Sequence, residues 1–311
     1  MIDGILIIDK PEKFTSHDVV ARLRRILKTK RIGHTGTLDP FATGVLVMLV
    51  GKATRLAQFL DKDTKEYEAI VRFGFETDTG DRTGELRITN YELRDFSDEE
   101  LEAALADFRG AIEQTPPMYS AKKVDGKKLY ELARKGVEIE RQPVKVAIYK
   151  LEILPQRTQR KTEMGIEDQK SKTEDHALRV ACSAGTYIRT LAEDIGKKIG
   201  VGAHLAELRR TRAGKFDLSK AVTIEELETI VAAGNLNDYL ISMNEAVAHL
   251  PQIVLSEKEI EDTRNGKKLR LETSDFADNQ TLRMIDAAEN LLAIGFYKTE
   301  EKSIQPKLVL M

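Results

Sequence analysis

The chain has 311 residues, 41% of them hydrophobic and 32% charged, and a formal net charge of −2. This composition is typical of a water-soluble globular protein with room for one large and one small domain. Its longest apolar run, residues 45–50, is far shorter than the roughly 20 residues of a membrane helix, and residues 1–4 do not begin a signal-peptide pattern. Cys182 is the only cysteine, which excludes an internal disulfide and a cysteine-rich zinc site. We therefore expect a cytoplasmic protein.

The first predicted elements are a short strand and a basic helix. Residues 5–8 form an apolar run that ends at a proline-containing turn. Ser16 is placed to cap a helix whose apolar residues recur with the helical period, namely Val19, Val20, Leu23, Ile26 and Leu27. Residues 22–31 carry six basic side chains and no acidic one, which suits a nucleic-acid partner. The same run is also typical of a plain solvated helix face.

The most unusual stretch is the glycine-rich loop of residues 33–44, G-H-T-G-T-L-D-P-F-A-T-G. Three glycines within this loop indicate a backbone that bends sharply or approaches another segment closely. Asp39 precedes Pro40, whose ring pushes the preceding residue toward extended geometry. The pattern predicts a carboxylate on a stiff loop between the basic helix and a buried strand at 45–50. An ordinary Asx-type turn is an open alternative.

Helical spacing and strand alternation predict the remaining elements of the first 248 residues. These are a short helix at 52–60, strands at 67–73, 144–154 and 178–182, and helices that begin near 97, 185 and 224. Ser97 and Glu100 form a capping box at the first of the later helices, and Gly200 ends the second. The acidic loop at 75–85 does not match the EF-hand ligand pattern, so we do not expect a calcium site there.

Other segments stand out by composition. Residues 116–121 contain two prolines and are predicted to be rigid, and a lysine-rich patch follows at 122–128. Residues 156–175 have almost no apolar side chains and are predicted to be a charged, flexible excursion. Toward the C-terminus, four short strand candidates predict a compact β-rich domain at 249–311, after a larger domain at 1–248.

The residue types exclude several kinds of chemistry. The five histidines are scattered without metal-ligand spacing, and the chain has no Gly-x-Ser-x-Gly elbow, Walker loop or dinucleotide-binding glycine pattern. What remains is Asp39, two candidate aromatic platforms, Tyr67 and Tyr187, and the cations Arg189 and those of 209–212. A carboxylate can act as a nucleophile without a cofactor, and aromatic side chains beside arginines can stack on single-stranded RNA bases. We expect neither a metal nor a cofactor.

Residues 33–44 resemble the catalytic motif G-H-T-G-x-L-D-P-x-A-T-G of the TruB family of pseudouridine synthases, which isomerise a uridine in the T-arm loop of tRNA. Further segments resemble other motifs of this family in the same order. They are D-K-P at 9–11 with T-S at 15–16, K-E-Y at 65–67, P-M-Y-S-A-K-K at 117–123 with G-K-K-L-Y at 126–130, C-S at 182–183 with G-T-Y-I-R-T-L at 185–191, and G-A-H-L at 202–205 with L-R-R at 208–210. One departure is Lys13, which stands where the family has glycine.

The resemblance implies a role for each matching residue. Asp39 is implied as the nucleophile, attacking either the ribose C1′ or the uracil C6, and Arg189 as the partner that keeps it ionised by lowering its pKa. Tyr67 is implied to stack on the target base and to accept a proton as the isomerisation is completed. His34 is implied to fill the gap that the extruded nucleotide leaves. The further substrate-binding positions are Lys10, Tyr187, Leu208, Arg209 and Arg210.

The implied fold is α+β, with a large mixed, mostly antiparallel sheet flanked by helices and a small β-rich C-terminal domain similar to the PUA domain. The implied activity is cofactor-free isomerisation of the T-loop uridine, conventionally position 55, by a stand-alone monomer that binds the tRNA stem-loop and flips the base. The basic segments at 22–31, 122–128 and 209–212 are expected to contact phosphates, which would make binding sensitive to salt.

Two alternatives to this function stay open. The first is a guide-dependent relative that works inside a ribonucleoprotein, and the absence of a basic tail in this chain disfavours it. The second is a non-catalytic RNA-binding or RNA-folding protein that uses the same cleft. The presence of Asp39, Tyr67 and Arg189 argues for catalysis.

Overall fold

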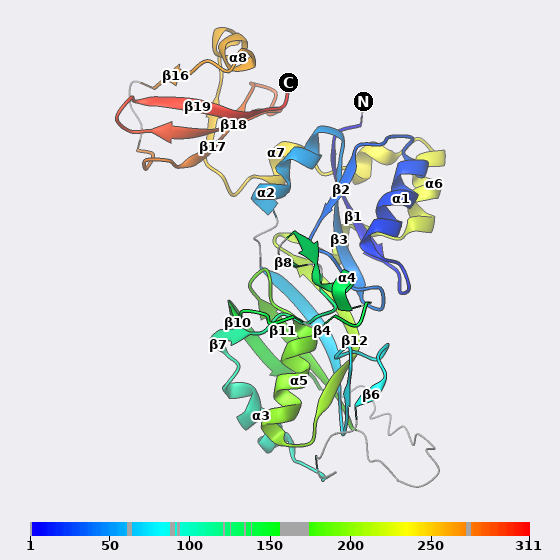
Figure 1. Ribbon diagram of the computed structural model, residues 1–311. Helices are drawn as coiled ribbons and strands as arrows, with labels where there is room; N and C mark the ends of the chain where they lie inside the picture. Colours follow the sequence, from blue (N-terminus) through cyan, green and yellow to red (C-terminus); the bar gives the residue numbers. More distant parts are fainter. Residues whose placement is uncertain are drawn as a thin grey trace.

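The computed structural model describes residues 2–60, 64–87, 91, 94–120, 122–124, 126–133, 135–137, 139–155, 174–271 and 275–311 (Figure 1). Most of the predicted charged excursion at 156–175 therefore lies outside the described residues. Its last two residues, Glu174 and Asp175, begin a strand instead. In the lysine-rich patch at 122–128, the side chains of Lys123, Lys127 and Lys128 also lie outside the description.

The body of the chain is built on one ten-stranded sheet. In chain order its strands are β1 (Gly4–Lys10), β2 (Ile32–Thr35), β3 (Thr43–Val50), β4 (Lys65–Phe73), β7 (Gly110–Gln114), β10 (Val144–Ile153), β11 (Glu174–Cys182), β12 (Ala203–Ala213), β13 (Phe216–Asp217) and β14 (Ala221–Val222). The spatial order is β14-β1-β3-β12-β4-β11-β10-β7, with β2 beside β3 and β13 beside β12. The β1–β14 and β3–β12 pairs are parallel and the other described pairs of this sheet are antiparallel. The expected mixed, mostly antiparallel sheet is confirmed.

Helices cover the two halves of this sheet separately (Figure 1). Helices α1 (Ser16–Ile26) and α6 (Ile224–Ala232) pack on the half made by β1 and β3, where Val19 and Leu23 join an apolar cluster with Leu6 and Ile8. Helices α3 (Asp98–Ala106) and α5 (Ile188–Ile199) pack on the half made by β4, β11 and β10. Strand β12 joins the halves, because it pairs with β3 on one side and β4 on the other.

The helix ends follow from local sequence with one difference from prediction. The capping box of Ser97 with Glu100 at α3 is confirmed, and Gly200 ends α5 in a left-handed conformation with φ of 87°. At α1 the cap is Thr15, whose side chain accepts a hydrogen bond from the amide of Asp18. The predicted cap, Ser16, is the first residue of the helix and its hydroxyl is used elsewhere.

Strand β12 was not predicted. Residues 203–206 are all buried, because α5 and neighbouring strands cover this end of the strand. Arg210, further along, is also buried, although an arginine in a sequence normally indicates a surface position. The alternation that marks a half-buried strand is therefore hidden.

Several short elements complete the first 250 residues. They are the 3₁₀ helices η1 (Gly51–Leu56), η2 (Leu218–Lys220) and η3 (Leu236–Tyr239), the helices α2 (Ala57–Leu60), α4 (Leu129–Ala133) and α7 (Met243–Ala246), and the two-residue strands β5 (Glu76–Thr77), β6 (Leu86–Arg87), β8 (Lys123–Val124) and β9 (Lys127–Lys128). The predicted loop at 75–85 thus contains one side of a small hairpin, in which β5 pairs with β6.

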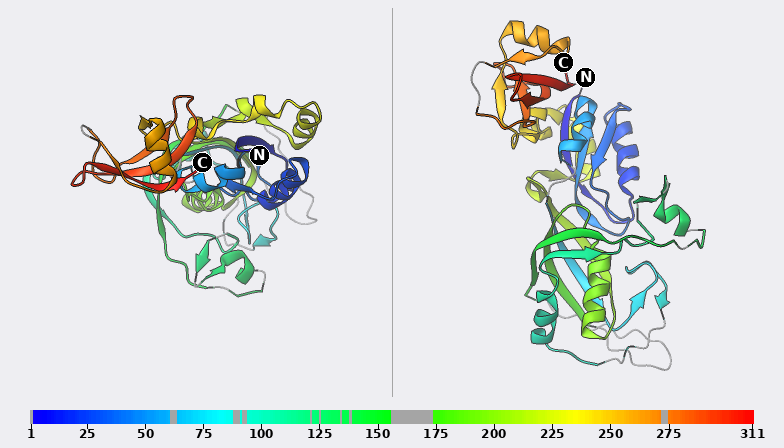
Figure 2. Two further views of the ribbon diagram at one scale, coloured as in Figure 1. Left: turned by 90° about the horizontal axis from the view of Figure 1, so that it is seen from above. Right: turned by 60° about the vertical axis from the view of Figure 1, so that its left-hand side comes forward.

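A second, five-stranded sheet follows in the C-terminal part of the chain. It consists of β15 (Gln252–Val254), β16 (Leu269–Arg270), β17 (Thr281–Ile285), β18 (Leu291–Lys298) and β19 (Ser303–Val309), in the order β15-β17-β18-β19-β16, with helix α8 (Glu257–Arg264). Ile294 and Leu308 of this sheet share an apolar cluster with Val47 and Leu56 of the main body. The two termini lie close together at the same end of the molecule (Figures 1 and 2). The β-rich C-terminal unit is as expected, whereas the boundary at 248/249 stays a prediction.

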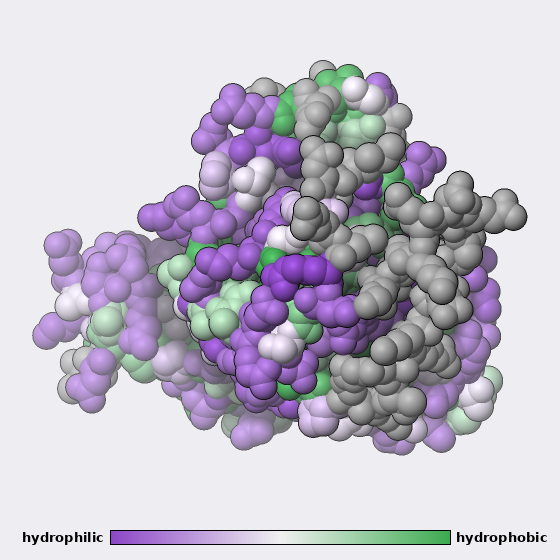
Figure 3. Space-filling view, turned by 90° about the horizontal axis from the view of Figure 1, so that it is seen from below, coloured by the Kyte–Doolittle hydropathy of each residue, from purple (hydrophilic) through white to green (hydrophobic). Residues whose placement is uncertain are grey.

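Figure 3 shows one face of the described surface. Seen from below, it is mainly hydrophilic with scattered small hydrophobic areas (Figure 3). Among the described residues, no helix has both the length and the apolar character needed to span a bilayer.

Candidate active site

Asp39 lies in the loop between β2 and β3, where the two halves of the large sheet meet. Two glycines of this loop are required by its geometry. Gly44 has φ of 98°, and a Cβ there would lie 2.2 Å from the carbonyl oxygen of Arg210 on β12. Gly36 has φ of 66°, and its Cβ would lie 3.2 Å from the Arg210 guanidinium. A sharp bend or close approach was also expected at Gly33. This was wrong, because a Cβ there would meet only a methyl group at 3.8 Å.

The residue before Asp39 is held by a buried hydroxyl. The Ser16 hydroxyl, 2% exposed, accepts a hydrogen bond from the amide of Leu38 at 3.0 Å and lies 3.3 Å from the Leu38 carbonyl oxygen, to which it can donate. The carbonyl of Asp39 accepts from the amide of Ala42 at 3.1 Å, which closes a tight turn. The carboxylate of Asp39 does not cap that turn within the described part of the chain, so the Asx-turn alternative does not hold.

The carboxylate of Asp39 faces the guanidinium of Arg189, which projects from the first turn of α5. The Nε atom of Arg189 lies 3.0 Å from Oδ2 of Asp39, and its Nη2 atom donates to Oδ1 at 3.3 Å. Both carboxylate oxygens are therefore engaged by one planar fork, which fixes the direction of the carboxylate as well as its charge. A third of the Asp39 side chain, 34%, stays exposed and can meet a substrate.

Arg189 is itself held on three further sides. It donates to the carbonyl of Thr79 at 3.0 Å and to the carbonyl of Tyr119 at 2.7 Å, and it lies 3.6 Å from a carboxylate oxygen of Asp81. Asp81 is only 4% exposed. Sequence analysis missed Asp81, because it is one acid among several in the loop at 75–85 and nothing local distinguishes it.

Burial raises the pKa of the Asp39 carboxyl above its ordinary value, and the nearby carboxylate of Asp81 raises it further. Arg189 is the largest influence in the opposite direction, and Lys10 adds to it. Arg189 thus lowers the pKa of Asp39, as expected. The loss of solvent outweighs this influence, so the net shift of the pKa is upward. Both cations favour the ionised form of the carboxyl and so oppose the effect of burial.

Lys10 and Arg210 lie beneath the loop rather than on its surface. Lys10 has no exposed surface, and its ammonium donates to the carbonyls of Pro11, Phe14 and Pro40. This burial lowers the pKa of Lys10 to about 8. Arg210, 1% exposed, donates to the carbonyls of Val45 and Gly36. Both were expected to bind substrate, but neither can contact RNA directly from these positions, and both instead hold the backbone of the loop.

Arg209, the neighbour of Arg210 on β12, has the opposite orientation. Its guanidinium forms a two-bond ion pair with the carboxylate of Asp9, at 2.6 and 3.1 Å, and its side chain is 40% exposed. It is accessible from solvent as a substrate-binding residue requires, although its charge is already balanced by Asp9.

Tyr67 and Leu208 belong to the floor of the site. Tyr67 on β4 is 8% exposed, lies opposite Arg210 in the β4–β12 ladder, and interacts electrostatically with Asp39. Burial raises the pKa of its phenol, so that the phenol is protonated at neutral pH. Leu208 is buried in the same apolar cluster as Tyr67 and Leu38.

Tyr187 and His34 occupy two edges of the region. Tyr187 is the N-cap residue of α5, is partly buried, and interacts electrostatically with both Arg189 and Asp39. His34 on β2 is partly exposed and packs edge-on against the ring of His17, with 6.2 Å between ring centroids. The structure thus brings Tyr187 to the Asp39–Arg189 pair, whereas the placement of His34 at the target nucleotide stays a prediction.

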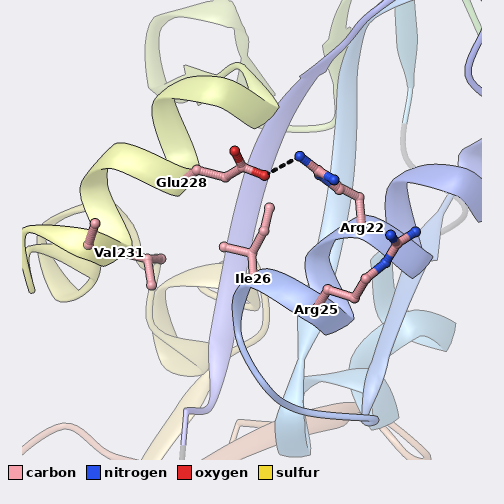
Figure 4. A pocket seen from close by; sticks show the side chains of 6 residues that line it. Arg22, Arg25, Ile26, Glu228 and Val231 are labelled. Atoms are coloured by element: carbon pink, nitrogen blue, oxygen red, sulfur yellow. Dashed lines mark ion pairs between the residues drawn. The ribbon is translucent and has the colours of Figure 1, made fainter.

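The basic helix α1 presents its cations in two directions. On one side Arg22 and Arg25 border an open pocket of about 350 Å³ between α1 and α6, where Arg22 pairs with Glu228 at 2.5 Å (Figure 4). On the other side Arg24 reaches toward β2 and donates to the carbonyl of Ile32 at 3.3 Å. Arg22 is one of the six basic residues of 22–31, and its charge is compensated by Glu228. Nowhere in the described part of the chain do three or more metal-binding side chains gather.

Two family models match consecutive parts of the chain. The family model described as TruB family pseudouridylate synthase (N terminal domain) matches residues 24–188, which include Asp39 and Tyr67. The model described as tRNA pseudouridylate synthase B C-terminal domain matches residues 189–248. The chain belongs to the TruB family of pseudouridylate synthases. It is therefore an isomerase.

Individual relatives cover nearly the whole chain. The tRNA pseudouridine synthase B of Geobacillus thermodenitrificans is 47% identical over 87% of this chain and 86% of its own length. That of Solibacter usitatus is 43% identical over 94% of this chain and 95% of its own length. Among solved structures, a Cbf5–Nop10–Gar1 complex contains a chain that is 26% identical, with a TM-score of 0.72, over 99% of this chain and 85% of that one. An H/ACA RNP bound to a substrate RNA containing 2′-deoxyuridine gives a TM-score of 0.71 at 25% identity, over 99% of this chain and 85% of that one.

Proposed function

We propose that this isomerase converts the T-loop uridine of tRNA, conventionally position 55, to pseudouridine. It acts as a monomer, without a guide RNA, a protein partner, a metal or a cofactor. The observation that carries the proposal is the Asp39–Arg189 pair, a partly exposed carboxylate aimed by a buried guanidinium fork. The named relatives, which are tRNA pseudouridine synthases B, support the choice of substrate.

The reaction requires a nucleophile and no redox partner. The bond between N1 of uracil and C1′ of ribose breaks, and a bond between C5 and C1′ forms. The proton lost from C5 is balanced by a proton gained at N1, so that no atoms or electrons are supplied from outside. Asp39 attacks C1′ or C6 as an ionised carboxylate and leaves again unchanged. Arg189 keeps it ionised against the effect of burial.

The target uridine has to leave its stack before it can meet Asp39, at a cost of a few kcal/mol. Tyr67 and Tyr187 would receive the base on their rings, Leu208 would line the apolar floor, and His34 would take the vacated place in the RNA loop. A proton-accepting role for Tyr67 is less well supported, because its raised pKa keeps the phenol protonated in the free enzyme. We therefore propose stacking as its main contribution.

Phosphate contacts would offset the cost of flipping. Exposed cations at the C-terminal end of α1 and beyond, from Arg24 to Arg31, and the half-exposed Arg209 are the candidates. Each phosphate neutralised lowers the slope of log K against log salt concentration by about 0.7 to 0.9. A tRNA filter-binding titration with potassium chloride tests this, and a flat response would exclude the proposed contacts.

Position-resolved pseudouridine mapping on an unmodified tRNA transcript is the direct test. Wild type and Asp39→Asn are each incubated with the transcript and nothing else. Modification of the T-loop uridine by wild type alone is the expected result. Modification by neither protein, with binding retained, would favour a guide-dependent enzyme or a non-catalytic RNA-binding protein. Modification by both would refute the role of Asp39 while leaving the family assignment intact.

A further inference from the structure

The last residue of β7, Gln114, has a buried side chain that sequence analysis did not single out. It is 1% exposed. Its Oε1 atom accepts a hydrogen bond from the amide of Tyr187 at 3.0 Å, and its Nε2 atom donates to the carbonyl of Tyr187 at 3.2 Å. The carboxamide thus pairs with both main-chain groups of one residue, as a neighbouring strand would do.

The residue that Gln114 holds is the entry to the catalytic helix. Tyr187 is the N-cap of α5, with φ of −101° and ψ of 105°, and no side chain caps this helix end. Its carbonyl also accepts the first helical hydrogen bond, from Leu191 at 3.0 Å. Arg189 follows two residues later. The direction of α5 at its first turn, and with it the position of Arg189, therefore depends on the Gln114 amide.

The segment after Gln114 touches the same helix again. The carbonyl of Tyr119 accepts a hydrogen bond from Nη2 of Arg189 at 2.7 Å, a shorter distance than that guanidinium makes to Asp39, Thr79 or Asp81. Pro116 and Pro117 stiffen the chain between the two contacts. One short stretch thus holds the backbone before Arg189 and the head of its side chain.

We propose that Gln114 is a positioning residue for the isomerisation. It places the ring of Tyr187 and the guanidinium of Arg189 against Asp39 and does not itself touch the RNA. This inference rests on the proposed function. It predicts that changes at Gln114 slow the chemical step while tRNA binding stays the same, because the binding cations lie elsewhere.

A merely structural role would leave a different signature. If the Gln114 amide only satisfied buried hydrogen-bonding groups, its replacement would lower the stability of the protein. The folded molecules would still react at the normal rate. A residue that contacts RNA would change the dissociation constant. The rate of a single turnover at saturating enzyme separates these three roles, because it reports the folded, bound complex.

Two variants of similar size provide the test. Gln114→Met fills the space without hydrogen bonds. Gln114→Glu keeps the acceptor for the Tyr187 amide, but its ionised carboxylate cannot donate to the Tyr187 carbonyl. When protonated, the glutamic acid restores that donor. Arg189 and Asp39 interact electrostatically with the Tyr187 phenol, so each variant is compared with wild type at the same pH.

The expected result is a single-turnover rate at least about tenfold below wild type for both variants at neutral pH, with an unchanged dissociation constant for tRNA. As pH falls, the rate of Gln114→Glu relative to wild type should recover, whereas that of Gln114→Met should not. Each rate is measured below the thermal unfolding range of the variant. If Gln114→Met does not fold, the pH recovery of Gln114→Glu still decides the matter.

Other results would overturn the inference. A normal single-turnover rate in a folded variant would leave Gln114 with a structural role only, and a weakened dissociation constant with a normal rate would make it a binding residue. Equal, pH-independent losses in both variants would exclude the two-bond contact as the cause. An inactive wild type would instead refute the proposed function, so the two failures are distinguishable.

Discussion

Replacing Arg189 by methionine and by lysine separates its charge from its geometry. Burial raises the pKa of Asp39, and Arg189 is the largest influence that opposes this shift. On the proposed mechanism, activity requires the ionised carboxylate, so kcat/KM should fall as pH decreases through the Asp39 pKa. Removing the cation in Arg189→Met raises that pKa further, and the acid limb of the profile should move to higher pH. Arg189→Lys retains a positive charge and should leave the limb near its wild-type position.

The size of the shift follows from the contact. Two unit charges about 4 Å apart attract by about 4 kcal/mol at an effective dielectric constant of 20. Because 34% of the Asp39 side chain is exposed, solvent screening reduces this to roughly 1.5 kcal/mol, or about one pH unit. The plateau activity of Arg189→Lys should still fall. The single nitrogen of an ammonium cannot hydrogen-bond at once to the carboxylate and to the carbonyls of Thr79 and Tyr119, which separate nitrogens of the guanidinium reach.

The assay is the initial rate of pseudouridine formation at subsaturating tRNA between pH 5 and 9. Arg209→Met is the matched control, because Arg209 pairs with Asp9 and not with Asp39, and its acid limb should coincide with that of wild type. An acid limb in Arg189→Met that stays in place or moves to lower pH would refute the electrostatic reasoning. Equal shifts in the methionine and lysine variants would show that geometry, not charge, controls the Asp39 pKa.

Further predictions concern the glycine-rich loop at 33–44 and its surroundings. Gly44→Ala should cost at least about 3 kcal/mol of unfolding free energy or prevent folding, because its Cβ would lie 2.2 Å from a β12 carbonyl oxygen; Gly33→Ala should be mild by comparison in the same urea titration. Lys13 has φ of 69°, a left-handed conformation that glycine adopts freely, so Lys13→Gly should raise the free energy of unfolding by about 0.5–1 kcal/mol. The urea midpoint should rise accordingly, and a lowered midpoint would contradict this. Ser16→Ala should cost about 1–3 kcal/mol and lower kcat, and unchanged kcat would show that its hydroxyl does not help to hold Asp39.

The sequence predicted the glycine-rich loop at 33–44 well because its requirements are local. Gly36 and Gly44 follow from backbone conformation and close approach, and the placement of Asp39 between a basic helix and a buried strand is visible in the order of residues. The departure at Lys13 also had a local meaning. Lys13 has the left-handed conformation that glycine would adopt freely, and the amide of Lys13 donates to the carbonyl of Pro40 at 2.8 Å.

The partners of that loop could not be derived locally. Arg189 is 150 residues away from Asp39, and only the family resemblance paired them. Asp81 and Gln114 act through contacts between elements that carry no signal in composition or spacing. The family resemblance implied that Lys10 and Arg210 bind substrate, and a charged side chain normally avoids the interior. Their burial is possible only because backbone carbonyls converge on each of them, which is a property of the folded chain.

On the proposed mechanism, the distribution of cations explains how Asp39 can be both partly buried and reactive. Lys10 and Arg210 bind carbonyls of the loop from beneath, and Arg189 binds the carboxylate from the side. Each cation has its own hydrogen-bond partners, so none has to move when the carboxylate reacts. On the proposed mechanism, the Asp39 carboxylate is thus already oriented in the free enzyme, and the binding energy of the RNA would be available for extruding the uridine instead of ordering the site. On this reasoning, variants at Lys10 or Arg210 should slow the chemical step without changing how strongly the stem-loop binds.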